Sequence, residues 1–231
     1  MPVPCLHVGM PMKGSGTAES YEVVRDDADG FGWIAYPDEE MQRASHAFTT
    51  DEGVYVVDPV EFPDLDEHLQ ALGDVAGVVL TLDRHERDSA AIARRHDVPV
   101  FYPEFFGEPD VDAETKPLRG VLGQFDVIPI VNTPFWNEVA LWDADAGVLW
   151  VSEAVGTVEY YTTGSETLGV HPMLRAFPPR KKLGDLSPGE LYCGHGAGVT
   201  TGATAALEDA LAGSRKRMVG LYAKTLKGLV T

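Results

Sequence analysis

The sequence predicts one α/β or α+β domain that spans residues 1–231 and contains two mixed β-sheets with helices outside them. Three observations support this prediction. Apolar residues make up 44% of the chain, which is enough for one sizeable core. Strand patterns alternate with helical patterns in the first half, and a second strand-rich stretch precedes helices near the C-terminus. No internal repeat or low-complexity linker divides the chain.

The first elements are short strands separated by Gly, Pro and Asp residues. Strands are expected at residues 21–24, 32–35, 44–49 and 54–58. A helix is expected to follow from Asp64 to Leu72. Asp64 suits an N-cap position, and leucines at 65, 69 and 72 share one helical face.

The middle of the chain begins with an apolar run typical of a buried strand, at residues 77–82. A helix at 87–96 and a strand at 98–102 are expected next. Four further strands are expected at residues 125–131, 138–142, 147–151 and 190–193, with a hairpin turn at 144–147. The last elements are two helices, at 204–211 and 215–226, separated by Gly213.

The composition is strongly acidic. The chain has 36 acidic and 18 basic residues, a net charge of −18, and only seven of the basic residues are lysine. We interpret this as adaptation to high salt, because an acid-rich, lysine-poor surface retains water and cations. An ordinary acidic protein is the alternative. The same charge argues against nucleic acid and anionic membranes as partners.

The location is predicted to be cytoplasmic. No apolar run reaches the roughly 18 residues of a membrane span. The segment 1–10 lacks the basic and apolar regions of a signal peptide. Cys5 and Cys193 are far apart without metal-type spacing, so both are expected to be inert thiols in a reducing compartment.

The C-terminal quarter differs in charge from the rest. Residues 175–231 hold nine basic and four acidic residues. These charges would suit an anionic substrate or RNA. We favour the simpler interpretation, in which they face the acidic remainder and suit the C-terminal ends of helices.

Candidate metal ligands lie where the buried strand at 77–82 gives way to a helix. Asp83, His85 and Asp88 supply two carboxylates and an imidazole within six residues. Such groups suit zinc, iron or manganese, and they would point into a cleft at the carboxyl end of the sheet. Taken alone, an acid-rich helix start is equally explained by capping.

This stretch resembles the signature of the metallo-β-lactamase superfamily, His-x-His-x-Asp-His after a strand that ends in Thr. Four more segments resemble motifs of that family, in the family's order, between about residues 44 and 212. They are Val56-Val57-Asp58-Pro59, Thr133-Pro134-Phe135-Trp136, Val151-Ser152-Glu153 with the residues up to Thr157, and Gly194-His195-Gly196. The resemblance implies a four-layer αββα sandwich.

The resemblance also implies a site. It suggests His85, Asp88, Glu153 and His195 as metal ligands, and Asp83 or Asp88 as the catalytic base. Asp58, Arg87 and Trp136 are expected to line the site. Relatives use two metals that share a bridging acid to hydrolyse esters, amides, thioesters or phosphoesters.

The sequence departs from the family pattern at most ligand positions. Asp83 and Asp88 stand where the signature has histidines, and Arg87 stands where it has Asp. Trp136 replaces the middle ligand His, and Glu153 replaces the bridging Asp, while His85 and His195 keep their residue type. The fixed charge of Arg87 opposes a second metal.

We therefore expect at most one divalent metal ion (zinc, iron or manganese) or none. In the metal-free alternative, an ion-pair network of Arg87, Asp88 and Glu153 replaces the metal. The favoured hypothesis is a hydrolase-like protein that acts on a small-molecule ester, thioester or phosphoester. The alternative is a non-catalytic protein that binds a small ligand or a partner, and a homo-oligomer stays open. The other histidines, His171 included, are expected at the surface or in the core.

Overall fold

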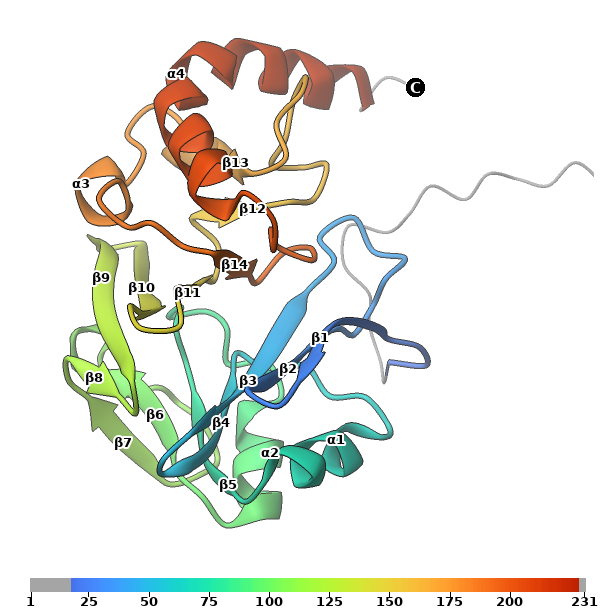
Figure 1. Ribbon diagram of the computed structural model, residues 1–231, viewed down its shortest axis with the longest axis vertical. Coiled ribbons are helices and arrows are strands. Elements are labelled where there is room, and N and C mark those ends of the chain that lie inside the picture. Colours follow the sequence, from blue (N-terminus) through green and yellow to red (C-terminus); the bar gives the residue numbers. More distant parts are fainter. Residues whose placement is uncertain (1–17, 229–231) are drawn as a thin grey trace, which may run out of the picture.

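The computed structural model describes residues 18–228 of the chain (Figure 1). Cys5 and the segment 1–10, on which the prediction about a signal peptide depends, lie outside the described residues. Within the described part, no helix combines the length and apolar character needed to cross a membrane.

Two β-sheets form the centre of the molecule. The larger sheet has seven strands in the order β1-β2-β3-β4-β5-β6-β7, and the smaller has five in the order β14-β11-β10-β9-β8. The strands of the larger sheet are β1 (Glu22–Asp27), β2 (Gly30–Ile34), β3 (Ala44–Thr50), β4 (Gly53–Val57), β5 (Val75–Val79), β6 (Val100–Pro103) and β7 (Thr115–Leu118). Those of the smaller sheet are β8 (Val121–Leu122), β9 (Phe125–Thr133), β10 (Trp136–Asp143), β11 (Val148–Val151) and β14 (Glu190–Cys193).

Helices cover the outer face of each sheet. In Figure 1, α1 and α2 lie beside the larger sheet, whereas α3 and α4 lie beside the smaller one. The helices are α1 (Leu65–Leu72), α2 (Ser89–His96), α3 (Arg180–Leu183) and α4 (Ala203–Gly228), with short 3-10 turns η1 (Glu104–Phe106) and η2 (Pro172–Leu174). A two-stranded sheet of β12 (Val155–Gly156) and β13 (Gly169–Val170) lies close to α4.

The alternation of side chains along the strands creates three apolar cores between four layers. On β4, Val54 and Val56 pack toward the helices, while Tyr55 and Val57 face the other sheet. On β11, Val151 packs on the outer side and Trp150 faces inward. The arrangement is an αββα sandwich, which confirms the fold expected from the sequence.

Parallel strands bring chemically important chain segments to one edge. β4 pairs in parallel with β5, and β11 pairs in parallel with β14, so both pairs share a carboxyl end. Backbone hydrogen bonds join the two sheets there: Val139 N donates to Thr81 O at 2.9 Å, and Ala44 N donates to Gly194 O at 3.0 Å. The loops after these four strands therefore converge.

Three expected helices differ from the structure. The helices expected at 204–211 and 215–226 are one continuous helix, α4. Gly213 does not end the helix, which is held by packing. A β-carbon at position 213 would lie 2.1 Å from Nη1 of Arg217, so glycine makes room for that side chain. The helix expected to start at residue 87 starts at Ser89, since Arg87 has a positive φ of 41°.

The N-cap expected at Asp64 is present by position only. Asp64 precedes α1, but its side chain makes no capping hydrogen bond.

The hairpin turn at 144–147 is confirmed, because Asp143 and Val148 pair across it in the antiparallel ladder of β10 and β11. Strands β7, β8, β12 and β13 were not expected, and each is short.

Glycine at position 32 is required by the close approach of His46. A β-carbon on Gly32 would lie 2.3 Å from Nε2 of His46, which is fully buried between the sheets. We expect Gly32→Ala to lower the free energy of unfolding by about 1–3 kcal/mol through overpacking, measured by urea denaturation. Gly189→Ala is the matched control, because its nearest neighbour atom is 3.7 Å away. Equal stability of the two variants would contradict this close approach.

Candidate metal centre

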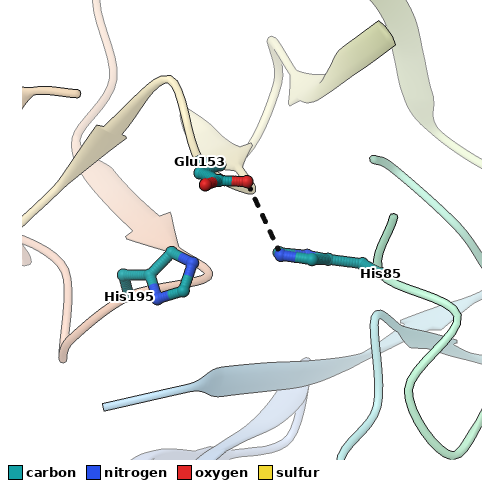
Figure 2. Close-up of side chains that lie close together, drawn as sticks. All are labelled: His85, Glu153 and His195. Carbon is teal, nitrogen blue, oxygen red and sulfur yellow. Dashed lines mark ion pairs between the residues drawn. The ribbon is translucent and has the colours of Figure 1, made fainter. Parts of the chain in front are cut away.

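Three ligand-type side chains meet at the shared edge of the two sheets. His85 follows β5, Glu153 follows β11 and His195 follows β14. One ligand atom from each lies within 4.8 Å of the others, and Figure 2 shows the three side chains facing a common space. The chain segments that carry them are far apart in sequence and are brought together by the parallel strand pairs.

Asp58, directly after β4, is the buried carboxylate beneath this cluster. Its oxygens accept hydrogen bonds from Thr81 N at 2.9 Å, Thr81 Oγ1 at 2.5 Å and Ser152 Oγ at 2.8 Å. Nδ1 of His85 lies 3.3 Å from Asp58 Oδ2. Although burial opposes it, the hydrogen bond and charge of His85, with the charge of Arg87, keep the pKa of Asp58 below its ordinary value.

His85 is oriented by this contact. With Nδ1 toward Asp58, Nε2 is directed at Glu153, whose Oε2 is 3.9 Å away (dashed line in Figure 2). Burial, followed by the charge of Arg87, lowers the pKa of His85 to about 4. The imidazole is therefore neutral near pH 7, and the lone pair of Nε2 meets a long contact of 3.4 Å from Nη2 of Arg87.

His195 is held in a similar way from the opposite side. Its Nδ1 lies 2.9 Å from the backbone oxygen of Met41, to which it donates a hydrogen bond. Its Nε2 is buried and has no hydrogen-bond partner in the described structure. Burial and the neighbouring charges of His85 and Arg87 lower the pKa of His195 well below its ordinary value. The result is a neutral imidazole with an unused lone pair that faces the cluster.

Glu153 supplies the carboxylate of the cluster. Arg84 Nη2 lies 2.9 Å from its Oε2, and His171 Nε2 lies 3.6 Å from its Oε1. Burial raises the pKa of Glu153, against the lowering effect of the charges of Arg84 and Arg87. Arg84 is 40% exposed and also lies over the ring of Trp136, so the guanidinium is the more exposed partner of this ion pair.

Glu138, in β10, holds the loop that carries Glu153. Its carboxylate accepts hydrogen bonds from Glu153 N at 2.7 Å, Ala154 N at 2.9 Å and Trp136 Nε1 at 2.8 Å. Burial raises the pKa of Glu138 to about 7. Because three donors converge on a fully buried group, Glu138 fixes the backbone position from which Glu153 enters the site.

Arg87 places a partly buried positive charge beside the cluster. Its Nη1 donates to Ala44 O at 2.8 Å and to Asp58 O at 2.7 Å, and its Nη2 lies 3.4 Å from His85 Nε2. Burial lowers the pKa of Arg87 to about 10, which still leaves it charged near neutral pH. The positive φ of Arg87 turns the chain so that its side chain points back toward β3 and β4.

The structure gathers some of the predicted site residues and separates others. His85, Glu153 and His195 meet, with Asp58, Arg87 and Trp136 around them. Asp83 accepts instead from Asn137 N at 2.9 Å, and Asp88 accepts from Glu61 N at 2.8 Å. Neither belongs to the metal-type cluster. Their roles as ligand or base stay predictions that no contact described here supports.

Two further residues near the cluster were not singled out from the sequence. His171 is 5% exposed, and its Nδ1 accepts from Met173 N, which leaves Nε2 to carry the proton that faces Glu153. Tyr161 packs its ring against both His171 and His195. Neither residue lies in a local motif, so only the folded chain reveals their place.

The three side chains fit a single divalent ion. Metal–ligand bonds of about 2.0–2.2 Å place the ligand atoms of a tetrahedral site roughly 3.4 Å apart. The atoms here lie within 4.8 Å of one another, so closure needs movements of about 1 Å. Two further features are typical of metal-binding histidines: Nε2 of His195 has no hydrogen-bond partner, and Nδ1 of His85 is held by the carboxylate of Asp58.

Comparison with known proteins identifies the fold. No protein-family model matches the sequence, and a search of curated proteins finds no match. Solved structures do match. One is a putative diflavin flavoprotein A 5 fragment from Nostoc sp. PCC 7120, with a TM-score of 0.60 and 15% identity, covering 88% of this chain and 100% of that chain. Another is the DIM-1 metallo-β-lactamase, with a TM-score of 0.55 and 12% identity, covering 85% of this chain and 99% of that chain.

The chain has the metallo-β-lactamase fold. A third structure with this fold, TTHA1623 in a di-iron-bound form, has a TM-score of 0.53 and 21% identity, covering 71% of this chain and 93% of that chain. At such identities the likeness establishes the architecture, whereas the chemistry of this metallo-β-lactamase-fold protein depends on its own site residues.

Replacing the buried carboxylate of Asp58 tests how far the centre depends on it. We expect Asp58→Asn to lower the free energy of unfolding by about 2–4 kcal/mol, because an amide would turn a donor toward Thr81 or Ser152. The positive φ of 44° at this position is tolerated by Asn, so the effect is not backbone strain.

Chemical denaturation of the metal-free protein measures the change. Asp88→Asn is the matched control in the same region. Its carboxylate accepts one backbone hydrogen bond, so a loss of about 1 kcal/mol or less is expected. An Asp58 variant as stable as the Asp88 variant would show that the buried network is not essential.

Proposed function

We propose that this metallo-β-lactamase-fold protein is hydrolase-like and binds one divalent metal ion through His85, Glu153 and His195. Its substrate is a small ester, thioester or phosphoester. The observation that carries the proposal is the unpartnered Nε2 of His195, buried beside a second neutral imidazole and a carboxylate. A buried lone pair without a partner is costly unless a ligand satisfies it.

The donor set favours a metal over other ligands. Two imidazoles and one carboxylate are the ligands of several catalytic zinc sites and of non-haem iron sites. Each imidazole is also oriented from behind, His85 by Asp58 and His195 by Met41 O, as ligating histidines usually are. The neutral state of both rings at pH 7 removes the need to expel a proton on binding.

Arg87 supports a mononuclear site. Its guanidinium lies 3.4 Å from His85 Nε2 and is fixed by two backbone oxygens, so it cannot move away at low cost. This charge already repels an ion bound at His85 Nε2, and a second dication would meet further repulsion from both, several kcal/mol at moderate effective dielectric. In this chain the guanidinium of Arg87 supplies the positive charge that a second metal ion would bring.

The ion would polarise a carbonyl or phosphoryl oxygen and lower the pKa of a bound water. The chain contributes orientation and charge. Glu138 holds the backbone of Glu153, and Asp58 holds the ring of His85. Arg84 pairs with Glu153 and is 40% exposed, so its guanidinium would also be within reach of an anionic group of the substrate.

Metal content tests the site. Protein purified without chelator, or refilled with Zn²⁺, Fe²⁺ or Mn²⁺, is expected to hold about one equivalent by elemental analysis. His85→Ala, Glu153→Ala and His195→Ala should each abolish stoichiometric binding, because a site of three protein ligands has none to spare. His96→Ala is the matched control, since His96 pairs with Asp66 away from the cluster. Wild-type protein with less than roughly a tenth of an equivalent would remove the proposal.

A non-catalytic ligand-binding protein is the second candidate function. One observation favours it: Arg84 already pairs with Glu153 at 2.9 Å, and Arg87 contacts His85, so the donor atoms are partly engaged by the chain itself. Such contacts could maintain a former metal site without metal.

Turnover separates the two functions. Metal-loaded protein is assayed against a generic ester, a thioester and a phosphodiester. We expect hydrolysis of at least one, reduced about 100-fold or more in Glu153→Ala and His195→Ala, because these changes remove the activating ion. His96→Ala should retain full activity. Turnover that is absent, or that persists unchanged in both ligand variants, would favour the non-catalytic function.

A further inference from the structure

Tyr161 presents a second unsatisfied polar group beside the cluster. The residue is 0% exposed, and its hydroxyl has no hydrogen-bond partner in the described structure. Its ring stacks on His195, with centroids 5.7 Å apart and an interplanar angle of 25°, and meets His171 edge-on at 5.3 Å. A buried hydroxyl that lacks a partner calls for a ligand, a water molecule or a functional reason.

The position of Tyr161 is fixed by several unrelated contacts. A β-carbon on Gly156 would lie 3.0 Å from its ring, and one on Gly169 would lie 2.1 Å from its backbone oxygen. That oxygen accepts a hydrogen bond from Arg175, which is fully buried and paired with Glu166 at 2.7 Å. Small residues and a buried ion pair therefore hold the tyrosine rigidly next to two site histidines.

The hydroxyl is a neutral donor at physiological pH. An ordinary tyrosine hydroxyl loses its proton only at about pH 10. Phenylalanine would fill the same space without leaving an unpaired polar atom, so packing alone does not explain the hydroxyl. A group that donates without ionising suits an oxygen that becomes negative in acyl or phosphoryl transfer.

We infer that the Tyr161 hydroxyl donates a hydrogen bond to an oxygen of the ligand bound at the metal centre, a carbonyl or anionic oxygen of the substrate. This inference rests on the proposed metal site, and it adds the chemical class of the group recognised there. Nε2 of His195 would then bind the metal ion, and the Tyr161 hydroxyl would bind an oxygen of the molecule on that ion, from adjacent stacked rings.

The test uses full-length protein with Zn²⁺ and inorganic phosphate as probes. Zn²⁺ affinity is measured first by competition titration in wild type, Tyr161→Phe and Tyr160→Phe, and should be similar in all three. Phosphate affinity of the zinc-loaded proteins is then measured by calorimetry. We expect about tenfold weaker phosphate binding for Tyr161→Phe. Tyr160→Phe is the neighbouring control, because Tyr160 is only partly buried, and its phosphate affinity should stay unchanged.

Thermal unfolding of the metal-free proteins gives a readout independent of ligand. Because the hydroxyl has no partner, Tyr161→Phe should be at least as stable as wild type. A lower Tm for this variant would show that the hydroxyl is already satisfied within the chain and would overturn the inference.

The remaining outcomes separate this inference from the proposed function. Failure of wild type to bind Zn²⁺ would remove the proposed function, and the role of Tyr161 with it. Normal Zn²⁺ binding with phosphate affinity unchanged in Tyr161→Phe, or lowered equally in Tyr160→Phe, would overturn the role of Tyr161 alone.

Discussion

The buried carboxylate of Asp58 is the interaction on which the centre depends. It ends β4, accepts from Thr81 beyond β5, and accepts from Ser152 beyond β11, so one side chain joins both sheets at the edge where the loops converge. Leaving a buried charge without these donors would be strongly destabilising. The same carboxylate orients His85. One group therefore both links the two sheets, through Thr81 and Ser152, and fixes the ring of a candidate metal ligand.

Much of the architecture could be predicted from the sequence, because strand patterning depends on local alternation. Residues such as Val56 and Trp150 carry the apolar faces that define the layers. The continuity of α4 through Gly213 was not predicted, since a glycine is a common helix stop signal; here the glycine leaves space for the side chain of Arg217, one turn further along the same helix.

The candidate site was predictable to a similar extent. The family resemblance placed His85, Asp88, Glu153 and His195 in one site, and the structure brings His85, Glu153 and His195 together. The contacts of Asp83 and Asp88 could not be predicted. Both accept hydrogen bonds from backbone N–H groups, of Asn137 and Glu61, that only the folded chain brings near them. Glu138, His171 and Tyr161 gave no local signal. They reach the cluster through a bulged strand and an irregular loop, whose course depends on packing.

The ion pair of Arg84 with Glu153 has a consequence for charge balance at the centre. The arginine bridges Glu153 and Trp136, and 40% of its side chain is exposed. In the metal-free chain the charge of Glu153 is thus balanced by an exposed cation, whereas the cation at Arg87 is fixed by backbone oxygens. If the proposed ion binds, the charge of Glu153 can be rebalanced by movement of this one exposed side chain, without separation of the two sheets.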